Sequence, residues 1–166
     1  MTFHLKNRDN TICDPDPSKW QAKTTSNYFG GKRLIVFRFP SAFAPTSSAY
    51  QLSGSEDNFG AFQEQGIDDI HVLLVNVAFV MNNRAEMQGI RNVRVIHTGS
   101  DELFRRIGML VRKESLGLLS SAIVDDGAIK TRFEEPGLCE NFAEDPYGVS
   151  PPENIMNWQK GAKAAA

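Results

Sequence analysis

Three short apolar segments constrain the fold of this chain more than any other feature. They span residues 34–39, 70–75 and 93–96, and they are rich in branched and aromatic side chains. Nearly continuous apolar runs of this length are typical of strands that are covered on both faces of a sheet. The segments between them, at 49–65 and 78–88, carry apolar residues at helical spacing. This alternation predicts parallel strands joined by crossover helices.

The two ends of the chain complete the predicted architecture. Residues 2–5 and 11–13 alternate in polarity around a turn-forming segment, which predicts an N-terminal β-hairpin. Asp125-Asp126-Gly127 predicts a tight turn between strands at 122–124 and 128–133. Further helices are expected from about residue 100 and from about residue 151. We therefore expect an α/β fold in which a mixed central sheet has helices on both faces, with a β-hairpin at the N-terminus.

Composition narrows the class of protein. The 166 residues are 41% hydrophobic and 23% charged, as in one globular domain, so we expect a single domain over 1–160 and a flexible tail over 161–166. A net charge of -2 argues against a nucleic-acid binder. No apolar run has the length of a signal-peptide core or a membrane span. The two cysteines, Cys13 and Cys139, suit a reducing compartment, so a cytoplasmic location is expected.

A functional site is expected in the loop after the first apolar strand. Open α/β sheets bind ligands beyond the carboxyl ends of their strands, and residues 40–48 lead from such an end into a helix N-terminus. A thiol at that N-terminus would ionise readily. The chain has Thr46, Ser47 and Ser48 there instead. The helix dipole contributes about 1 kcal/mol, which is too little to ionise a hydroxyl.

The same loop carries a family resemblance. Pro40-Ser41-Ala42-Phe43-Ala44-Pro45-Thr46-Ser47-Ser48 resembles the active-site loop of type-5 peroxiredoxins, which reads Pro-Gly-Ala-Phe-Thr-Pro-Thr-Cys-Ser. Segments at 75–81, 104–111, 135–137 and 145–150 resemble further motifs of that family in the same order. The resemblance implies a thioredoxin-like fold, commonly dimeric. It also implies a thiol peroxidase that reduces peroxides with glutathione, glutaredoxin or thioredoxin.

The chain departs from the family at the residues that do the chemistry. The peroxidatic cysteine falls on Ser47, the peroxide-orienting threonine on Ala44 and the peroxide-binding arginine on Leu119, while Pro40 is retained. Peroxide reduction needs a thiolate, hydrogen-bond donors and a cation. Serine cannot form a sulfenic acid, and alanine and leucine side chains donate no hydrogen bond. The departures predict a vestigial site in a protein that serves as a binding or assembly subunit, as a homodimer or within a larger assembly.

Two alternatives remain open from the sequence. In the first, the protein is a thiol peroxidase, and this sequence is an inactivated form of it in which serine replaces the cysteine. In the second, the protein senses a peroxide or small ligand without turnover. A serine nucleophile at Ser47 would need a base, but His71 and His97 lie in or beside apolar strands and are interpreted as structural. Cys13 and Cys139 are interpreted as unreactive. Because cysteines and histidines are dispersed, no metal site and no cofactor are expected.

Overall fold

The computed structural model describes residues 2–8, 18–38, 52–74, 85–98, 102–106, 120–134 and 148–164. The strands in these segments are β1 (Thr2–Arg8), β2 (Ser18–Thr24), β3 (Arg33–Arg38), β4 (Asp69–Leu74), β5 (Arg94–His97), β6 (Ser120–Asp125) and β7 (Ala128–Glu134). The helices are α1 (Thr25–Phe29), α2 (Leu52–Asp57), α3 (Phe59–Glu64), α5 (Glu102–Arg106) and α6 (Pro152–Ala164). None of the helices in the described segments is long and apolar enough to cross a membrane.

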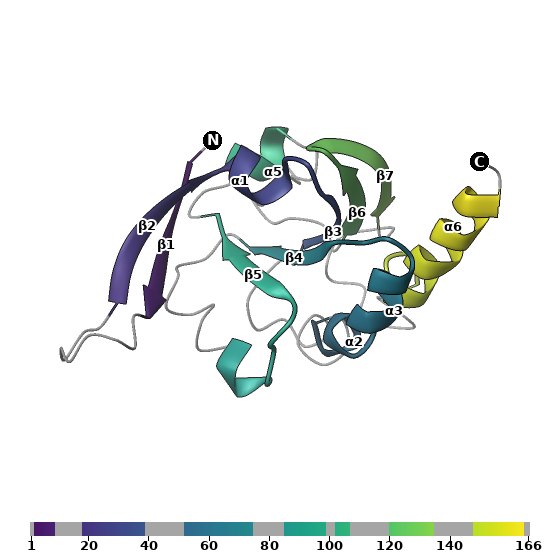
Figure 1. Ribbon diagram of the computed structural model, residues 1–166, viewed down its shortest axis with the longest axis horizontal. Helices are drawn as coiled ribbons and strands as arrows, with labels where there is room; N and C mark the ends of the chain where they lie inside the picture. Colours follow the sequence, from purple (N-terminus) through teal and green to yellow (C-terminus); the bar gives the residue numbers. More distant parts are fainter. Residues whose placement is uncertain are drawn as a thin grey trace.

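The three apolar segments form three adjacent strands of a five-stranded sheet with the order β5-β4-β3-β6-β7, in which β5 is an edge strand. The β3 strand runs parallel to β4, and β4 runs parallel to β5. The β6 strand runs antiparallel to β3, and β7 runs antiparallel to β6. The predicted mixed sheet is therefore confirmed, and its apolar strands start and end within one residue of the predicted bounds (Figure 1).

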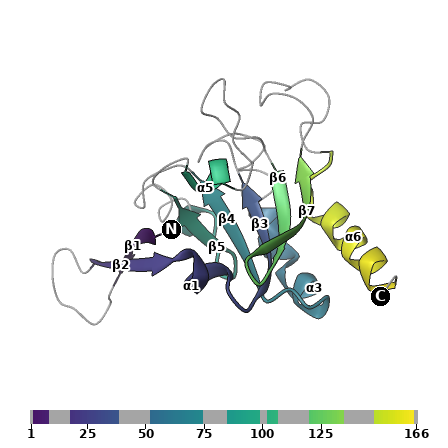
Figure 2. The same cartoon turned by 90° about the horizontal axis from the view of Figure 1, so that it is seen from above.

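Helices cover both faces of this sheet, as predicted. Successive strand residues point to opposite faces, so alternate positions of β3 belong to different clusters of the core. On one face, Ile35 and Phe37 pack with residues of α2, α3 and α6. On the other, Leu34 and Val36 pack with residues of α1 and α5. Figures 1 and 2 show α1 and α5 on the side of the sheet opposite α2 and α3.

The tight turn predicted at Asp125-Asp126-Gly127 is confirmed. The strands on either side of it pair in an antiparallel hairpin that closes with Asp125 opposite Ala128. Both central residues have positive φ, 46° at Asp126 and 76° at Gly127. This is the conformation of a two-residue type I′ turn, which favours aspartate or asparagine followed by glycine.

The N-terminal hairpin is also confirmed, but its second strand differs from the prediction. The β1 strand pairs with β2 in a separate two-stranded sheet, with Thr2 opposite Thr24 and Arg8 opposite Ser18. The strand expected at 11–13 lies outside the described residues. The segment 18–24 alternates less regularly in polarity than the predicted partner, 11–13, but it is seven residues long. A seven-residue pairing forms more backbone hydrogen bonds than a three-residue segment can, which favours 18–24 as the partner of β1.

The prediction of a single helix at 49–65 was wrong in one respect, because two helices occupy the described part of that segment. The α2 helix ends before Asn58, where ψ is 5°, and α3 follows. The Asn58 side chain donates a 2.8 Å hydrogen bond to the backbone oxygen of Gly54, and asparagine often competes with helix geometry in this way. Gly66, at φ +82°, then ends the helical region, as predicted.

Two further expectations concern helix bounds. The helix expected at 78–88 lies mostly outside the described residues, and only 85–87 are seen as a helical turn. The last helix, α6, begins at Pro152, close to the predicted start, and continues to Ala164. It therefore includes the first four residues of the segment predicted as a tail.

Candidate site at the carboxyl edge of the sheet

The parallel strands β3, β4 and β5 all end at one edge of the sheet, which we call the carboxyl edge. Their last residues are Arg38, Leu74 and His97. The β6 strand begins at this same edge, because Ser120 pairs with Arg38. In open α/β sheets this is the edge at which ligands bind.

The four predicted site residues, Pro40, Ala44, Ser47 and Leu119, lie outside the described residues. Chain connectivity nevertheless relates the two segments that carry them to the carboxyl edge. Pro40 follows the end of β3 by two residues, and Leu119 immediately precedes the start of β6. The described ends to which these two segments connect lie side by side, because Arg38 pairs with Ser120.

The carboxyl edge is polar although it is buried. Arg38 is 1% exposed, and Ser120 and Ser121 are fully buried beside it. A guanidinium stays protonated in proteins, so Arg38 brings a permanent positive charge to this edge. Sequence reasoning assigned Arg38 only to a strand. The available signal was that it is the one charged residue in the apolar run 34–39, two residues before Pro40, the first residue of the predicted site loop.

Ser121 is a second residue that the sequence reasoning did not single out. Its hydroxyl is buried and makes no hydrogen bond within the described part of the chain. It pairs with Phe37, whose side chain packs on the α2 side of the sheet. A buried hydroxyl without a partner is uncommon in folded proteins. It follows Leu119, one of the predicted site residues, by two positions in the sequence.

The two strand histidines lie at different ends of the sheet. His97 is the last residue of β5 and lies at the carboxyl edge. The next residue, Thr98, donates its backbone N–H to the backbone oxygen of Leu74 at 2.9 Å, which ties the end of β5 to the end of β4. His71 lies near the opposite end of β4, with its Nε2 3.2 Å from Oδ2 of Asp69. The His71 ring also stacks edge-on against Tyr28, with ring centroids 5.8 Å apart. His71 therefore belongs to a buried contact at the amino end of β4, away from the carboxyl edge.

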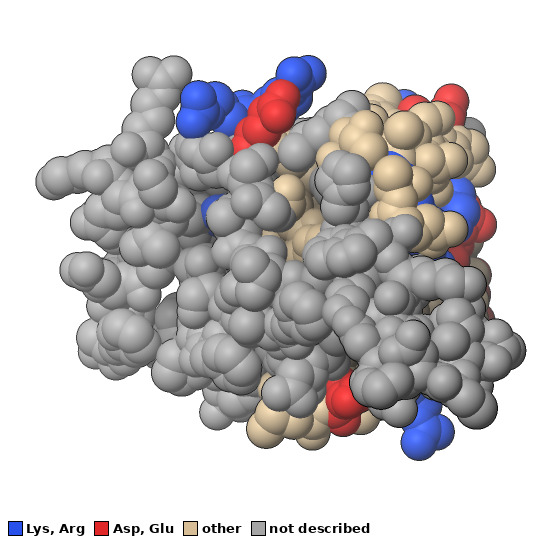
Figure 3. Space-filling model, turned by 90° about the vertical axis from the view of Figure 1, so that its left-hand side faces the viewer, with Lys and Arg blue, Asp and Glu red and all other residues tan. Residues whose placement is uncertain are grey.

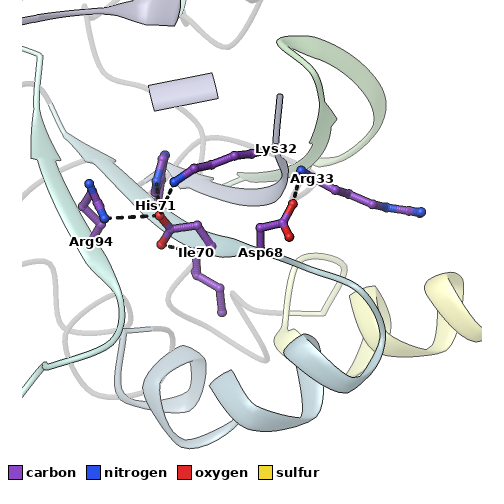
Figure 4. Close-up of polar contacts among 7 residues, drawn as sticks. Lys32, Arg33, Asp68, Ile70, His71 and Arg94 are labelled. Carbon is purple, nitrogen blue, oxygen red and sulfur yellow. Dashed lines mark hydrogen bonds and ion pairs between the residues drawn. The ribbon is translucent and has the colours of Figure 1, made fainter. Parts of the chain in front are cut away.

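Asp69 is the centre of a cluster of charged groups at that amino end (Figure 4). Its carboxylate lies 3.5 Å from Nζ of Lys32 and 3.4 Å from Nη2 of Arg94, in addition to His71. Burial raises the pKa of Asp69, but His71, Arg94 and Lys32 together lower the pKa further, so that the net direction is downward. Burial lowers the pKa of His71, and Asp69 opposes this only in part. The cluster holds an ionised carboxylate beside a neutral imidazole and connects three segments of the sheet.

On one face of the molecule, the described residues form no patch of a single charge sign. Figure 3 shows that face, where Lys and Arg lie next to Asp and Glu around its margin. One such pair is Glu102 and Arg106 on α5, with Oε1 and Nη2 2.6 Å apart. In the described segments, no three His, Cys, Asp or Glu side chains lie close enough together to hold a metal ion.

Comparison with known proteins identifies the family of the chain. The redoxin family pattern matches residues 11–145. A peroxiredoxin from Rhizobium etli is 45% identical over 96% of this chain and 92% of its own length. Peroxiredoxin sll1621 from Synechocystis is 38% identical over 99% of this chain and 89% of its own length.

Solved structures agree with this assignment. The antioxidant protein of Plasmodium falciparum, a 1-Cys peroxiredoxin, superposes with a TM-score of 0.82 at 25% identity, over 97% of this chain and 96% of that one. The family match, the bacterial relatives and the shared thioredoxin-like fold all lead to the same conclusion: this chain is a member of the peroxiredoxin family.

Proposed function

We propose that this peroxiredoxin-family protein lacks thiol peroxidase activity and serves as a non-catalytic binding or assembly subunit. The observation that carries the proposal is a serine, Ser47, at the position where the resemblance to the family's active-site loop places the peroxidatic cysteine. Reduction of a peroxide by a thiolate transfers one oxygen to sulfur and gives a sulfenic acid, which a second thiol then reduces. A serine hydroxyl has no equivalent step. The remaining thiols, Cys13 and Cys139, are not at that position.

Two further substitutions support the same proposal. The same resemblance places the family's peroxide-orienting threonine at Ala44 and its peroxide-binding arginine at Leu119. Even with a thiol at position 47, the attacked peroxide would lack a donor and a cation at these two positions. Arg38 provides a cation at the carboxyl edge. Because side chains alternate along β3, Arg38 shares the α1 side of the sheet with Leu34 and Val36, whereas α2 covers the other side.

The experiment is a peroxide-consumption assay with dithiothreitol, thioredoxin and glutaredoxin plus glutathione as reductants. We expect the protein with Ser47 to consume hydrogen peroxide no faster than buffer with reductant. A Cys13→Ser/Cys139→Ser variant measures any contribution of the two other thiols. Turnover that disappears in this double variant would overturn the proposal.

Restoration of the site provides the matched comparison. We expect Ser47→Cys alone to be slow, and Ser47→Cys combined with Ala44→Thr and Leu119→Arg to be faster by roughly 10²-fold, the effect of one or two preorganised donors. All variants are first compared by circular dichroism, so that a folding defect is separated from a missing group.

The alternative is a thiol-dependent peroxidase represented by an inactivated Cys-to-Ser form, with glutathione, glutaredoxin or thioredoxin as reductant. The observation that favours it is that relatives 45% and 38% identical to this chain are named peroxiredoxins. If Ser47→Cys alone reached the rate of the triple variant, Ala44 and Leu119 would be adequate in an active enzyme. That result, or a cysteine codon at position 47 in the natural gene, would support the alternative.

The assembly role has a separate test. We propose a homodimer or a subunit of a larger assembly, acting in the cytoplasm, since two cysteines in a domain of this size suit a reducing compartment. Size-exclusion chromatography of native extracts, compared with the purified chain, measures the assembly. A homodimer predicts that both samples elute as a dimer, and a subunit of a larger assembly predicts a larger species in the extract than in the purified sample. Elution of both samples as a monomer would contradict the proposal.

A further inference from the structure

A pocket of about 380 Å³ lies on the α1 side of the sheet, between α1, α5 and the β6–β7 hairpin. Figure 1 shows α1 and α5 on one side of the sheet, and β6 and β7 as the strands at one end of it. The floor of the pocket includes Val36, Leu73 and Ala122, from three adjacent strands, and Phe29 and Leu103 contribute to its walls. Its volume lies in the lower part of the range of small-molecule sites, and such sites combine an apolar lining with a few polar groups.

One charged group lies at this pocket. Asp126 is the only charged residue among the described residues that line it. The left-handed turn fixes the Asp126 backbone, and its Oδ1 accepts a 2.6 Å hydrogen bond from the Gly31 N–H. Its backbone N–H donates to the carbonyl of Lys32 at 2.9 Å. The carboxylate is therefore held in place beside an apolar cavity. The hydrogen bond from Gly31 uses only Oδ1, so the turn does not need the second oxygen, Oδ2.

We propose that this pocket binds a small organic cation, an aromatic or branched apolar body that carries one ammonium group. The apolar floor and walls accommodate the body, because burial of its surface is favourable. The Asp126 carboxylate accepts a charge-assisted hydrogen bond from the ammonium. An anionic ligand of the same shape would be repelled by Asp126. The site is on the sheet face opposite α2, so the proposal does not depend on the chemistry of position 47.

Three probes with the same ring system test the proposal: tryptamine, indole and indole-3-acetate. Each is titrated into ¹⁵N-labelled protein, and amide shifts are followed by NMR. A ligand of about this size binds with a dissociation constant on the order of 1 mM. We expect saturable shifts at the amides of Gly30, Gly127 and Ile129, with tryptamine binding about threefold more tightly than indole and indole-3-acetate more weakly than both. A threefold preference is the range of a solvent-accessible charge pair.

Asp126→Asn is the deciding variant, and Asp125→Asn is its matched control. Asparagine suits a left-handed turn position, and its side-chain oxygen can still accept from Gly31, so Asp126→Asn removes the charge and keeps the turn. Asp125 is the last residue of β6, directly before Asp126, and it does not line the pocket. We expect Asp126→Asn to abolish the preference for tryptamine over indole, and Asp125→Asn to preserve it.

A second variant tests the location of the probe. Ala122→Leu adds volume at the floor of the pocket and should weaken all three probes at least threefold, provided that circular dichroism shows a native fold. The Asp126→Asn and Asp125→Asn pair decides the question even if that variant does not fold. Shifts that map elsewhere, binding that does not saturate, or a tryptamine preference that survives Asp126→Asn would each overturn the proposal.

Discussion

At the scale of single residues, the Asp69 cluster explains why a histidine is stable inside an apolar strand. His71 is fully buried, and its neutral form avoids the free-energy cost of burying a second charge beside Lys32 and Arg94. The sequence already implies part of this arrangement, since residues two apart on a strand share a face. It does not imply the two cations, because their side chains come from other segments that only tertiary folding brings together.

The protonation of His71 predicts how stability depends on pH. The pKa of His71 is lowered below 6.5 in the folded state. Below pH 6.5 the unfolded chain therefore binds a proton that the folded chain does not, and the free energy of unfolding falls as pH decreases. We expect His71→Phe to make this fall between pH 7 and pH 5 smaller, because the variant has no imidazole to take up a proton on unfolding, as measured by urea unfolding at each pH.

Tyr28→Phe is the control for the His71 variant. It keeps the ring that packs against His71 and removes only a hydroxyl whose pKa is raised above 10.0 by burial, well outside the pH range of the experiment. Its stability should therefore depend on pH between 5 and 7 as that of the unmodified protein does. Parallel curves for His71→Phe and the unmodified protein would show that His71 does not titrate on unfolding.

Arg38 shows the limit of residue-level prediction at the candidate site. The apolar run 34–39 predicted a buried strand, and one charged residue at its end was compatible with an exposed strand terminus. Burial of Arg38 depends on its pairing with Ser120, at the start of a strand far along the chain. The predicted site residues were found from the resemblance, because no local pattern links position 47 to position 119.

At the scale of elements, the sheet was predictable and the helices less so. The strands at 34–39 and 70–75 were predicted within one residue of β3 and β4, since buried strands have a strong apolar signal. The β6–β7 hairpin was predicted from its Asp-Gly turn. The break between α2 and α3 was not, because it falls at Asn58, whose side chain donates to the backbone oxygen of Gly54, and apolar spacing carries no information on such a contact.

Two glycines in this helical region predict opposite effects of the same substitution. Gly54 lies within α2, and a Cβ there would be 3.7 Å from Cγ of Pro152, an ordinary contact. Gly66 has φ +82°, which an L-residue adopts at a cost. We expect Gly54→Ala to raise the free energy of unfolding by about 0.5–1 kcal/mol and Gly66→Ala to lower it by about 1 kcal/mol. Chemical denaturation measures both, and effects of the same sign would contradict the backbone argument.

At the scale of the whole molecule, the described part of the chain forms a core on both faces of the central sheet. The core clusters consist of apolar side chains from the strands and the covering helices. Among the described residues, eleven buried side chains pack on the α2 side of the sheet and seven on the α1 side. Burial of apolar surface on both faces is the main favourable contribution to the free energy of unfolding, so both layers of helices are needed to complete the fold.

The C-terminal helix predicts where the domain ends. Ile155 and Gln159 of α6 are fully buried, and Oε1 of Gln159 accepts a 2.7 Å hydrogen bond from Arg33. Lys160 and Gly161, which follow, are exposed. We expect deletion of residues 161–166 to change the free energy of unfolding by about 1 kcal/mol or less, and deletion of 152–166 to lower it by more than about 3 kcal/mol, because it uncovers the core at Ile155. Thermal unfolding of both truncated chains measures this. Loss of the cooperative transition in the shorter deletion would place residues 161–166 inside the domain.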